Sequence, residues 1–181
     1  MLTVVTGGSG SGKSEFAEQL IMRQTGGGQI YYIATMQPFG SEGARRIARH
    51  RKQRAGMGFI TLEQYARIEN ADVPKGAGAL LECMSNLAAN EMFDGRRGRS
   101  ATEIRDDIIR GVEALYARCD KLVIVTNEIF SDGNSYDRKT REYIQCMGEI
   151  NRSLAKMADC VVEVVYSIPV YIKNGELYEC D

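Results

Sequence analysis

Short apolar runs alternate with longer amphipathic stretches along this chain. Four apolar runs rich in β-branched residues cover 2–6, 29–35, 121–127 and 160–168, and a shorter, similar apolar run covers 78–83. Helical patterns lie between them, at 13–24, 41–54, 101–118 and 137–158. Near-continuous apolar strands that alternate with helices are typical of a parallel sheet covered on both faces. The pattern predicts one doubly wound α/β domain over 1–181, and the tail from 168 to 180 predicts a short hairpin with Asn174 and Gly175 in a type I′ turn.

A glycine-rich segment directly follows the first predicted strand and opens the first predicted helix. Its residues fit the pattern G-x-x-x-x-G-K-[ST], and we predict that all of them bind nucleotide phosphates: Gly7, Gly8, Ser9, Gly10, Ser11, Gly12, Lys13 and Ser14. The glycines let backbone N–H groups turn inward toward phosphate oxygens. Lys13 supplies a mobile cation and the Ser14 hydroxyl a ligand for Mg²⁺. This places the fold in the P-loop NTPase (RecA-like) type.

A P-loop also needs an acidic partner at the end of a neighbouring strand to hold Mg²⁺. Glu82 follows the apolar run of ALLEC and suits that role, which makes Ser14 and Glu82 the predicted metal ligands. Glu128, after KLVIVTN, is a second candidate. Each of these glutamates has the alternative of being an ordinary strand-end charge that faces water.

The single histidine of the chain, His50, lies in the basic run RRIARHRKQR at 45–54. On a helix, Arg46, His50 and Arg54 share one face. Neighbouring positive charge lowers the pKa of a histidine and keeps its imidazole neutral, which is the nucleophilic form. His50 is thus a candidate nucleophile toward phosphorus. The alternatives are a surface histidine on a solvated basic helix and a helix that contacts nucleic acid.

Composition narrows the choice of partner. The 23 basic and 24 acidic residues give a net charge of −1, which does not favour a non-specific nucleic-acid binder. The five cysteines form no CxxC pair, so we do not expect a zinc-type centre. We expect the cysteines to be reduced thiols in a cytoplasmic protein. We see no secretory signal and no stretch long enough to span a membrane.

Several ordered stretches together resemble one family, the bifunctional adenosylcobinamide kinase / adenosylcobinamide-phosphate guanylyltransferases of cobalamin assembly. The resemblance covers nearly the whole chain. It is carried by VVTGGSGSGKSEFAE at 4–18, YIAT at 32–35, RRIARHR at 45–51, LLEC at 80–83, VTNE at 125–128, GEINRSLA at 148–155, AD at 158–159 and SIPVYIK at 167–173. The P-loop alone is generic, whereas the ordered set is specific to this family.

The resemblance implies roles for individual residues. His50 matches the histidine that becomes guanylylated, which makes His50 and Lys13 the expected catalytic residues. The other matched nucleotide-binding positions are Ile33, Ala34, Thr35, Arg51, Lys52, Gln53, Arg54, Glu63 and Glu82. The resemblance also implies GTP and ATP as substrates with Mg²⁺, a corrinoid acceptor and a homotrimer. Two reactions are implied: phosphorylation of adenosylcobinamide, then transfer of GMP through a histidine–GMP intermediate to give adenosyl-GDP-cobinamide.

The chain departs from the family pattern at two places. Gly10 stands where the family has an arginine, and the segment 129–143 lacks the usual glycine–hydrophobic–proline turn. We assign that segment to the corrinoid side or to a subunit contact. Two other classes stay open: a P-loop kinase of another small molecule with no guanylyltransferase step, and a nucleotide-switched binding module or nucleic-acid ATPase.

Overall fold

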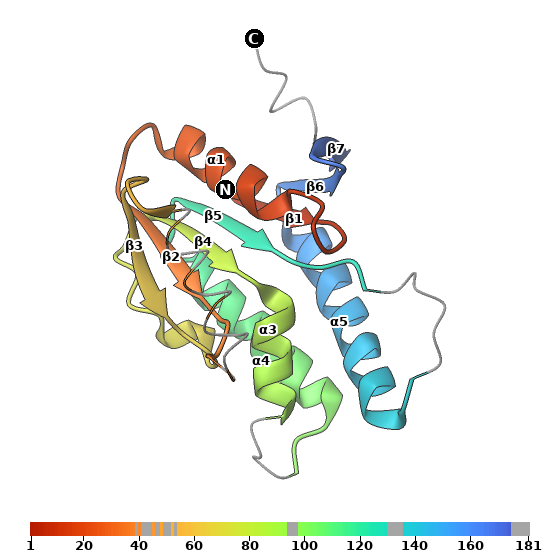
Figure 1. Ribbon diagram of the computed structural model, residues 1–181. Helices are drawn as coiled ribbons and strands as arrows, with labels where there is room; N and C mark the ends of the chain where they lie inside the picture. The colour runs from red at the N-terminus through yellow and green to blue at the C-terminus, as the bar shows by residue number, and fades with distance from the viewer. Residues whose placement is uncertain are drawn as a thin grey trace.

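The computed structural model contains a seven-stranded sheet with helices on both faces (Figure 1). The structure describes residues 1–38, 40, 45, 48, 52, 54–93, 98–129 and 136–174. The strands are β1 (Leu2–Thr6), β2 (Ile30–Ala34), β3 (Phe59–Glu63), β4 (Gly78–Glu82), β5 (Lys121–Val125), β6 (Cys160–Val165) and β7 (Ile168–Lys173). The helices are α1 (Lys13–Thr25), the short 3₁₀ helix η1 (Ile68–Asn70), α3 (Met84–Phe93), α4 (Ala101–Tyr116) and α5 (Arg138–Met157).

The strands follow the order β3-β2-β4-β5-β1-β6-β7. Every neighbouring pair is parallel except β6 and β7, which are antiparallel. The first strand therefore lies inside the sheet, between β5 and β6. Its residues Leu2, Val4 and Val5 are almost completely buried, as expected for a parallel strand covered on both faces.

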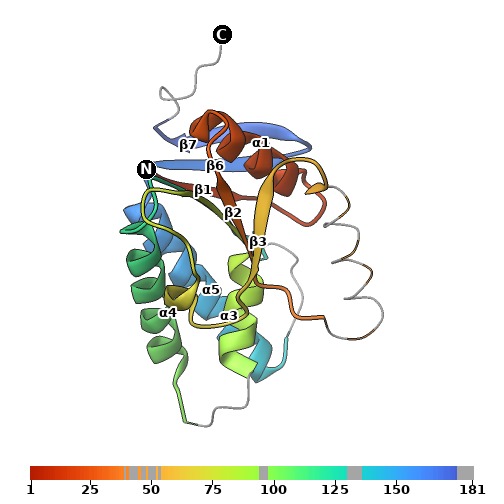
Figure 2. The ribbon, with the colours of Figure 1, turned by 90° about the vertical axis from the view of Figure 1, so that its left-hand side faces the viewer.

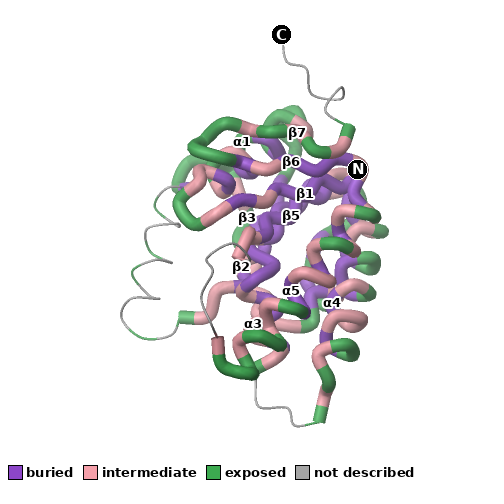
Figure 3. Tube along the Cα trace, turned by 90° about the vertical axis from the view of Figure 1, so that its right-hand side faces the viewer, coloured by how far each residue is buried: buried purple, intermediate pink, exposed green. Residues whose placement is uncertain are grey.

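Helix α1 lies on one face of the sheet, and α3, α4 and α5 lie on the other (Figures 2 and 3). An apolar layer holds the helices to each face. On one face, Leu20 and Ile21 of α1 pack in the same cluster as Val5 of β1. On the other face, α3, α4 and α5 form the second cluster, which includes Ile108 and Ile150. None of the helices among the described residues is long and apolar enough to cross a membrane.

The two long helices begin where their sequences provide side-chain caps. The Ser100 hydroxyl accepts a hydrogen bond from the backbone N–H of Glu103, and the Glu103 carboxylate accepts one from the N–H of Ser100. Before α5, the Asp137 carboxylate accepts from the N–H groups of Lys139 and Thr140. Both observed starts agree with the predicted helices to within one residue.

A hairpin is present near the C-terminal end of the sheet, but β6 and β7 form it rather than the predicted residues 168–180. The predicted strand 160–168 breaks at Tyr166 and Ser167, whose φ angles of 50° and 64° form a two-residue turn between β6 and β7. A tight turn with two positive φ angles reverses the chain with the twist that antiparallel strands need. The predicted turn at Asn174 extends into residues 175–181, which lie outside the described part of the chain.

Three elements among the described residues were not predicted: β3, α3 and the short helix η1. Strand β3 lies at the edge of the sheet and is only partly buried, so it lacks the continuous apolar run of the central strands. Helix α3 is ten residues long and follows β4 almost at once. The predicted helix 41–54 lies mostly outside the described residues.

Candidate nucleotide-binding site

The predicted site residues gather where the parallel strands end. The register pairs Ala34 at the end of β2 with Glu63 of β3 on one side and with Glu82 of β4 on the other. The glycine-rich loop follows β1 at the same edge. Ligands of open α/β sheets bind at the carboxyl ends of the strands, and these residues occupy that location.

Two glycines of the loop are required by contacts as well as by backbone angles. Gly12 has a φ of 89° and caps the N-terminus of α1, and a Cβ there would lie 2.6 Å from the Ser167 hydroxyl. A Cβ on Gly7 would lie 2.5 Å from the carbonyl oxygen of Val164. The loop therefore stays close to the β6–β7 hairpin, and α1 begins with N–H groups directed at the space where phosphates bind.

The Lys13 ammonium lies inside the loop. Its Nζ donates a hydrogen bond to the Gly8 carbonyl at 2.9 Å, and the residue is only 8% exposed. Burial lowers the pKa of Lys13, while the nearby carboxylate of Glu82 and the thiol of Cys83 act in the opposite direction. A phosphate bound in the loop would add anionic acceptors and favour the charged ammonium.

Both predicted metal ligands meet, although 68 positions separate them in the sequence. The Ser14 hydroxyl donates to Glu82 Oε1 at 2.6 Å, while Glu82 Oε2 is buried and has no hydrogen-bond partner among the residues that the structure describes. Burial raises the pKa of Glu82, opposed by the Ser14 hydrogen bond and by the charges of Lys13 and Arg54. An oxygen pair with one unsatisfied carboxylate oxygen fits Mg²⁺, which prefers oxygen ligands.

No group of three or more metal-ligating side chains occurs among the described residues. Mg²⁺ is usually held by one or two side chains together with substrate phosphates and water, so a site for it does not require such a group. The second candidate, Glu128, reaches the loop through its backbone: its N–H donates to the Gly7 carbonyl at 3.2 Å. Glu82 is therefore the better placed of the two acidic candidates.

A cavity opens beside Glu82. It is lined by Tyr32, Ala34, Met36, Arg54, Thr61, Glu63, Tyr65, Glu82, Cys83 and Asn86. A more open hollow of about 720 Å³ adjoins it and shares Arg54, Thr61 and Glu63. The Glu63 carboxylate accepts a hydrogen bond from the Tyr65 hydroxyl at 2.8 Å. The two volumes together form a space beside Glu82 whose walls combine apolar surface with the charged side chains of Arg54 and Glu63.

Only one of the three predicted residues at the end of β2 lines this cavity with its side chain. Ala34 does, whereas Ile33 and Thr35 are completely buried. The Thr35 hydroxyl donates to the Cys83 carbonyl and accepts from the Cys83 N–H, each at 2.8 Å. The Thr35 side chain therefore fixes the end of β2 to the end of β4 beneath the site.

Arg54 is anchored to the sheet and to α1. Its guanidinium carbon lies 3.5 Å from the centre of the Tyr32 ring, and its Nη1 lies 3.9 Å from Glu18 Oε1. Burial raises the pKa of Glu18 to about 7, the carboxylate of Glu82 adds to the rise, and Arg54 opposes it. Stacking and pairing hold the Arg54 guanidinium in place at the wall of the cavity.

Of the other predicted nucleotide-binding residues in the basic run, the structure describes only one. Lys52 is exposed, while His50, Arg51 and Gln53 lie outside the described residues. Their predicted roles stay predictions.

Several residues that were not predicted to belong to the site support it from beneath. The Asn127 amide donates to the Ser85 hydroxyl at 2.5 Å, and the Thr126 hydroxyl donates to the Asn151 amide oxygen at 2.7 Å. The sequence pattern could have identified Asn127, since this residue ends the apolar run KLVIVTN at the carboxyl end of a predicted strand. Nothing in the local sequence marks Glu18, because its partner Arg54 is distant in the sequence.

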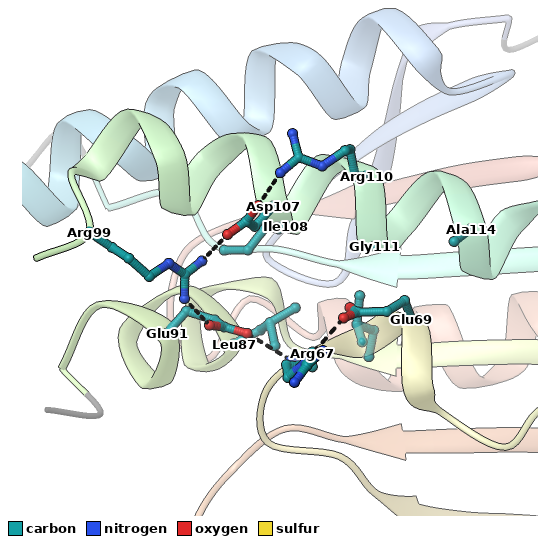
Figure 4. Close-up of a pocket in the computed structure, with 11 residues that line it drawn as sticks. Arg67, Glu69, Leu87, Glu91, Arg99, Asp107, Ile108, Arg110, Gly111 and Ala114 are labelled. Carbon is teal, nitrogen blue, oxygen red and sulfur yellow. Dashed lines mark hydrogen bonds and ion pairs between the residues drawn. The ribbon is translucent and has the colours of Figure 1, made fainter. Parts of the chain in front are cut away.

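A second pocket, of about 540 Å³, lies between η1, α3 and α4 (Figure 4). Arg99 pairs with both Glu91 and Asp107 there, and Arg110 also pairs with Asp107. Arg67 pairs with Glu69, and its backbone N–H donates to Glu91. Each charged side chain of this pocket therefore has an opposite charge beside it, and we assign the cluster to the packing of the helices.

Known proteins with related names match this chain over nearly its whole length. The family model described as cobinamide kinase / cobinamide phosphate guanyltransferase matches residues 3–172. The bifunctional adenosylcobalamin biosynthesis protein CobU of Escherichia coli K12 is 34% identical over 185 residues, covering 96% of this chain and 100% of that protein. The CobU protein of Salmonella typhimurium is 35% identical with the same coverage.

A third relative, the bifunctional adenosylcobalamin biosynthesis protein CobP of Pseudomonas aeruginosa, is 27% identical over 98% of this chain and 100% of its own length. Among solved structures, the ATPase domain of G40P gives a TM-score of 0.49 at 10% identity, over 90% of this chain and 68% of that chain, a likeness too weak to carry weight. The match to the family model and the full-length relatives decide the assignment. The chain belongs to the cobinamide kinase / cobinamide phosphate guanyltransferase family.

Proposed function

We propose that this protein catalyses the two reactions for which its family is named. In the first, the γ-phosphoryl group of ATP or GTP passes to the aminopropanol hydroxyl of adenosylcobinamide. In the second, GMP from GTP passes to the resulting phosphate and gives adenosyl-GDP-cobinamide. The observation that carries the proposal is the Ser14–Glu82 pair, which lies at the mouth of a P-loop beside a cavity whose wall includes Glu82 itself, Glu63 and Arg54.

In the kinase step, the loop N–H groups and the Lys13 ammonium hold the phosphates in place. Ser14 and Glu82 would hold Mg²⁺, which supplies positive charge toward the transferring phosphoryl group. The Lys13 ammonium also stabilises the negative charge of the transferring phosphoryl group. Its burial strengthens that interaction because little water screens it. The protein forms no covalent bond in this step, and positioning and electrostatic stabilisation provide the catalysis.

In the guanylyltransferase step, His50 attacks the α-phosphorus of GTP. A nitrogen–phosphorus bond forms, pyrophosphate leaves, and the imidazole carries GMP as a phosphoramidate. The phosphate oxygen of cobinamide phosphate then attacks the same phosphorus and releases His50. Glu63 in the cavity wall can accept hydrogen bonds from the N–H groups of guanine, while Arg54 places positive charge near the phosphates.

We further propose a cytoplasmic homotrimer. Four cysteines, Cys83, Cys119, Cys146 and Cys160, are free and buried, which supports a reducing compartment. The trimer rests on the family resemblance, and sedimentation velocity of the purified protein tests it: a single monomeric species would contradict it.

The experiment that tests the function uses GTP labelled at the α-phosphate. Wild-type protein should acquire an acid-labile, base-stable label, and mass spectrometry should place a GMP adduct on His50. His50→Ala should lose the label and the formation of adenosyl-GDP-cobinamide, by several orders of magnitude in rate, and keep most of the kinase activity. Arg45→Ala, an exposed position at the start of the same basic run, is the matched control and should retain both activities.

Two results would contradict the guanylyltransferase half of the proposal. One is a GMP adduct on a residue other than His50, and the other is full transferase activity in His50→Ala. Phosphorylation of cobinamide with no protein-bound GMP would identify a kinase alone. Absence of both activities in the wild-type protein would overturn the whole proposal.

A further inference from the structure

The turn between β6 and β7 packs directly on the phosphate loop. The Ser167 N–H donates a hydrogen bond to the Ser11 carbonyl at 2.8 Å. The Ser167 side chain fills the space beside Gly12, and the Val164 carbonyl fills the space beside Gly7. Loop and turn therefore form one packed unit, and a side chain on the turn has a fixed position relative to bound phosphates.

Tyr166, next to Ser167, presents an aromatic side chain that its local structure does not explain. The residue is 91% exposed and has a φ of 50°. Tight turns of this kind favour asparagine and glycine, which tolerate a positive φ, over a bulky aromatic residue. Ile168, the next residue after Ser167, is also largely exposed. An aromatic ring held in a strained turn and directed to solvent beside a phosphate site has the properties of a ligand contact.

The position of the turn relative to Ser14 and Glu82 indicates how a nucleoside triphosphate would be oriented in the loop. Strand β1 lies between β5 and β6 in the sheet, so Glu82 at the end of β4 and the β6–β7 turn lie on opposite sides of the loop (Figure 1). Lys13, Ser14 and Glu82 hold the terminal phosphate side of a triphosphate that donates its γ-phosphoryl group. The nucleoside at the other end of that triphosphate then extends toward the turn.

We propose that Tyr166 stacks on the nucleobase of the triphosphate that donates the phosphoryl group. This inference rests on the kinase half of the proposed function and assigns a nucleoside contact on the β6–β7 side of the loop. Stacking on an aromatic ring accepts any base, because every base has a π-face. Tyr166 should therefore contribute to ATP and GTP binding alike in this step.

The test compares Tyr166→Ala and Tyr166→Phe in the full chain, with adenosylcobinamide as acceptor. Loss of a base–aromatic stack should raise the KM for ATP, and for GTP as phosphoryl donor, by roughly 5- to 150-fold. Tyr166→Phe keeps the ring and should keep both KM values. Ile172→Ala, which removes another exposed apolar side chain from β7, is the matched control and should behave as wild type.

Inorganic tripolyphosphate separates base stacking from damage to the loop, since it has phosphates and no base. Calorimetry should show that Tyr166→Ala binds it as tightly as wild type does while ATP binds more weakly. Equal weakening of both ligands would overturn the proposal and make the turn a mere support for the loop. An increase confined to the KM for adenosylcobinamide would overturn it too, because Tyr166 would then face the acceptor.

Sedimentation velocity of Tyr166→Ala gives a further control. Dissociation of subunits would assign Tyr166 to a subunit contact and overturn the proposal. Unchanged donor KM values in Tyr166→Ala, with both activities present in the wild type, would end this inference and leave the proposed function intact. A wild-type protein without kinase activity would instead remove the proposed function on which the inference rests.

Discussion

Glu18 provides a test of the electrostatics under the site. Its carboxyl group faces Arg54 and Tyr32, and burial together with Glu82 and Glu15 raises its pKa from 4.5 to about 7 against the effect of Arg54. The folded protein therefore binds this proton more tightly than the unfolded chain does. The resulting stability is fully present below about pH 4.5 and is lost as the pH rises through about 7. At 1.36 kcal/mol per pH unit, the loss amounts to about 3 kcal/mol.

The substitution Glu18→Gln keeps the shape of the side chain and removes its titration. Urea unfolding should be followed from about pH 5 to about pH 8.5 for the wild type and the variant. The free energy of unfolding of the wild type should fall by up to about 3 kcal/mol relative to that of Glu18→Gln over this range. Glu113→Gln, on the exposed face of α4, should follow the wild type. Parallel curves for wild type and Glu18→Gln would refute the reasoning.

The phosphate loop and its acidic partner give two further predictions. Lys13→Ala should reduce both half-reactions, because each needs a triphosphate held in the same loop; steady-state rates check this, and loss of only one activity would point to a second nucleotide site. Glu82→Gln should raise the Mg²⁺ concentration for half-maximal activity by roughly 10- to 100-fold, since the buried carboxylate charge is removed. Magnesium titrations that coincide for wild type and Glu82→Gln would demote Glu82 to an ordinary strand-end residue.

Features with a local cause were predictable from the sequence. The central strands leave uninterrupted apolar runs, and the P-loop leaves a glycine pattern that few other structures need. Glu82 could be placed because it ends such a run, and strand ends of a parallel sheet share one edge. The register confirmed that placement by setting Ala34 between Glu63 and Glu82.

Features that depend on distant residues could not be predicted in this way. The run CVVEVVYSI favours a strand throughout, and nothing local marks Tyr166 and Ser167 as a turn; the pairing of β7 back onto β6 decides it. The resemblance places Thr35 at the nucleotide, and only the structure shows that its hydroxyl bonds to Cys83, 48 positions away. The partners of Glu18 are likewise supplied by other elements of the fold.

The central position of β1 has a consequence for how the protein is made. The ribosome produces β1 first among these strands, but its neighbours β5 and β6 begin only at residues 121 and 160. At about 5–20 residues per second, roughly 10–30 s pass before β6 and the turn at Ser167 exist. During that interval the nascent chain exposes an apolar strand and a phosphate loop that lacks its supporting turn. We therefore expect nucleotide to assist the folding of this domain only after the turn at Ser167 has been synthesised.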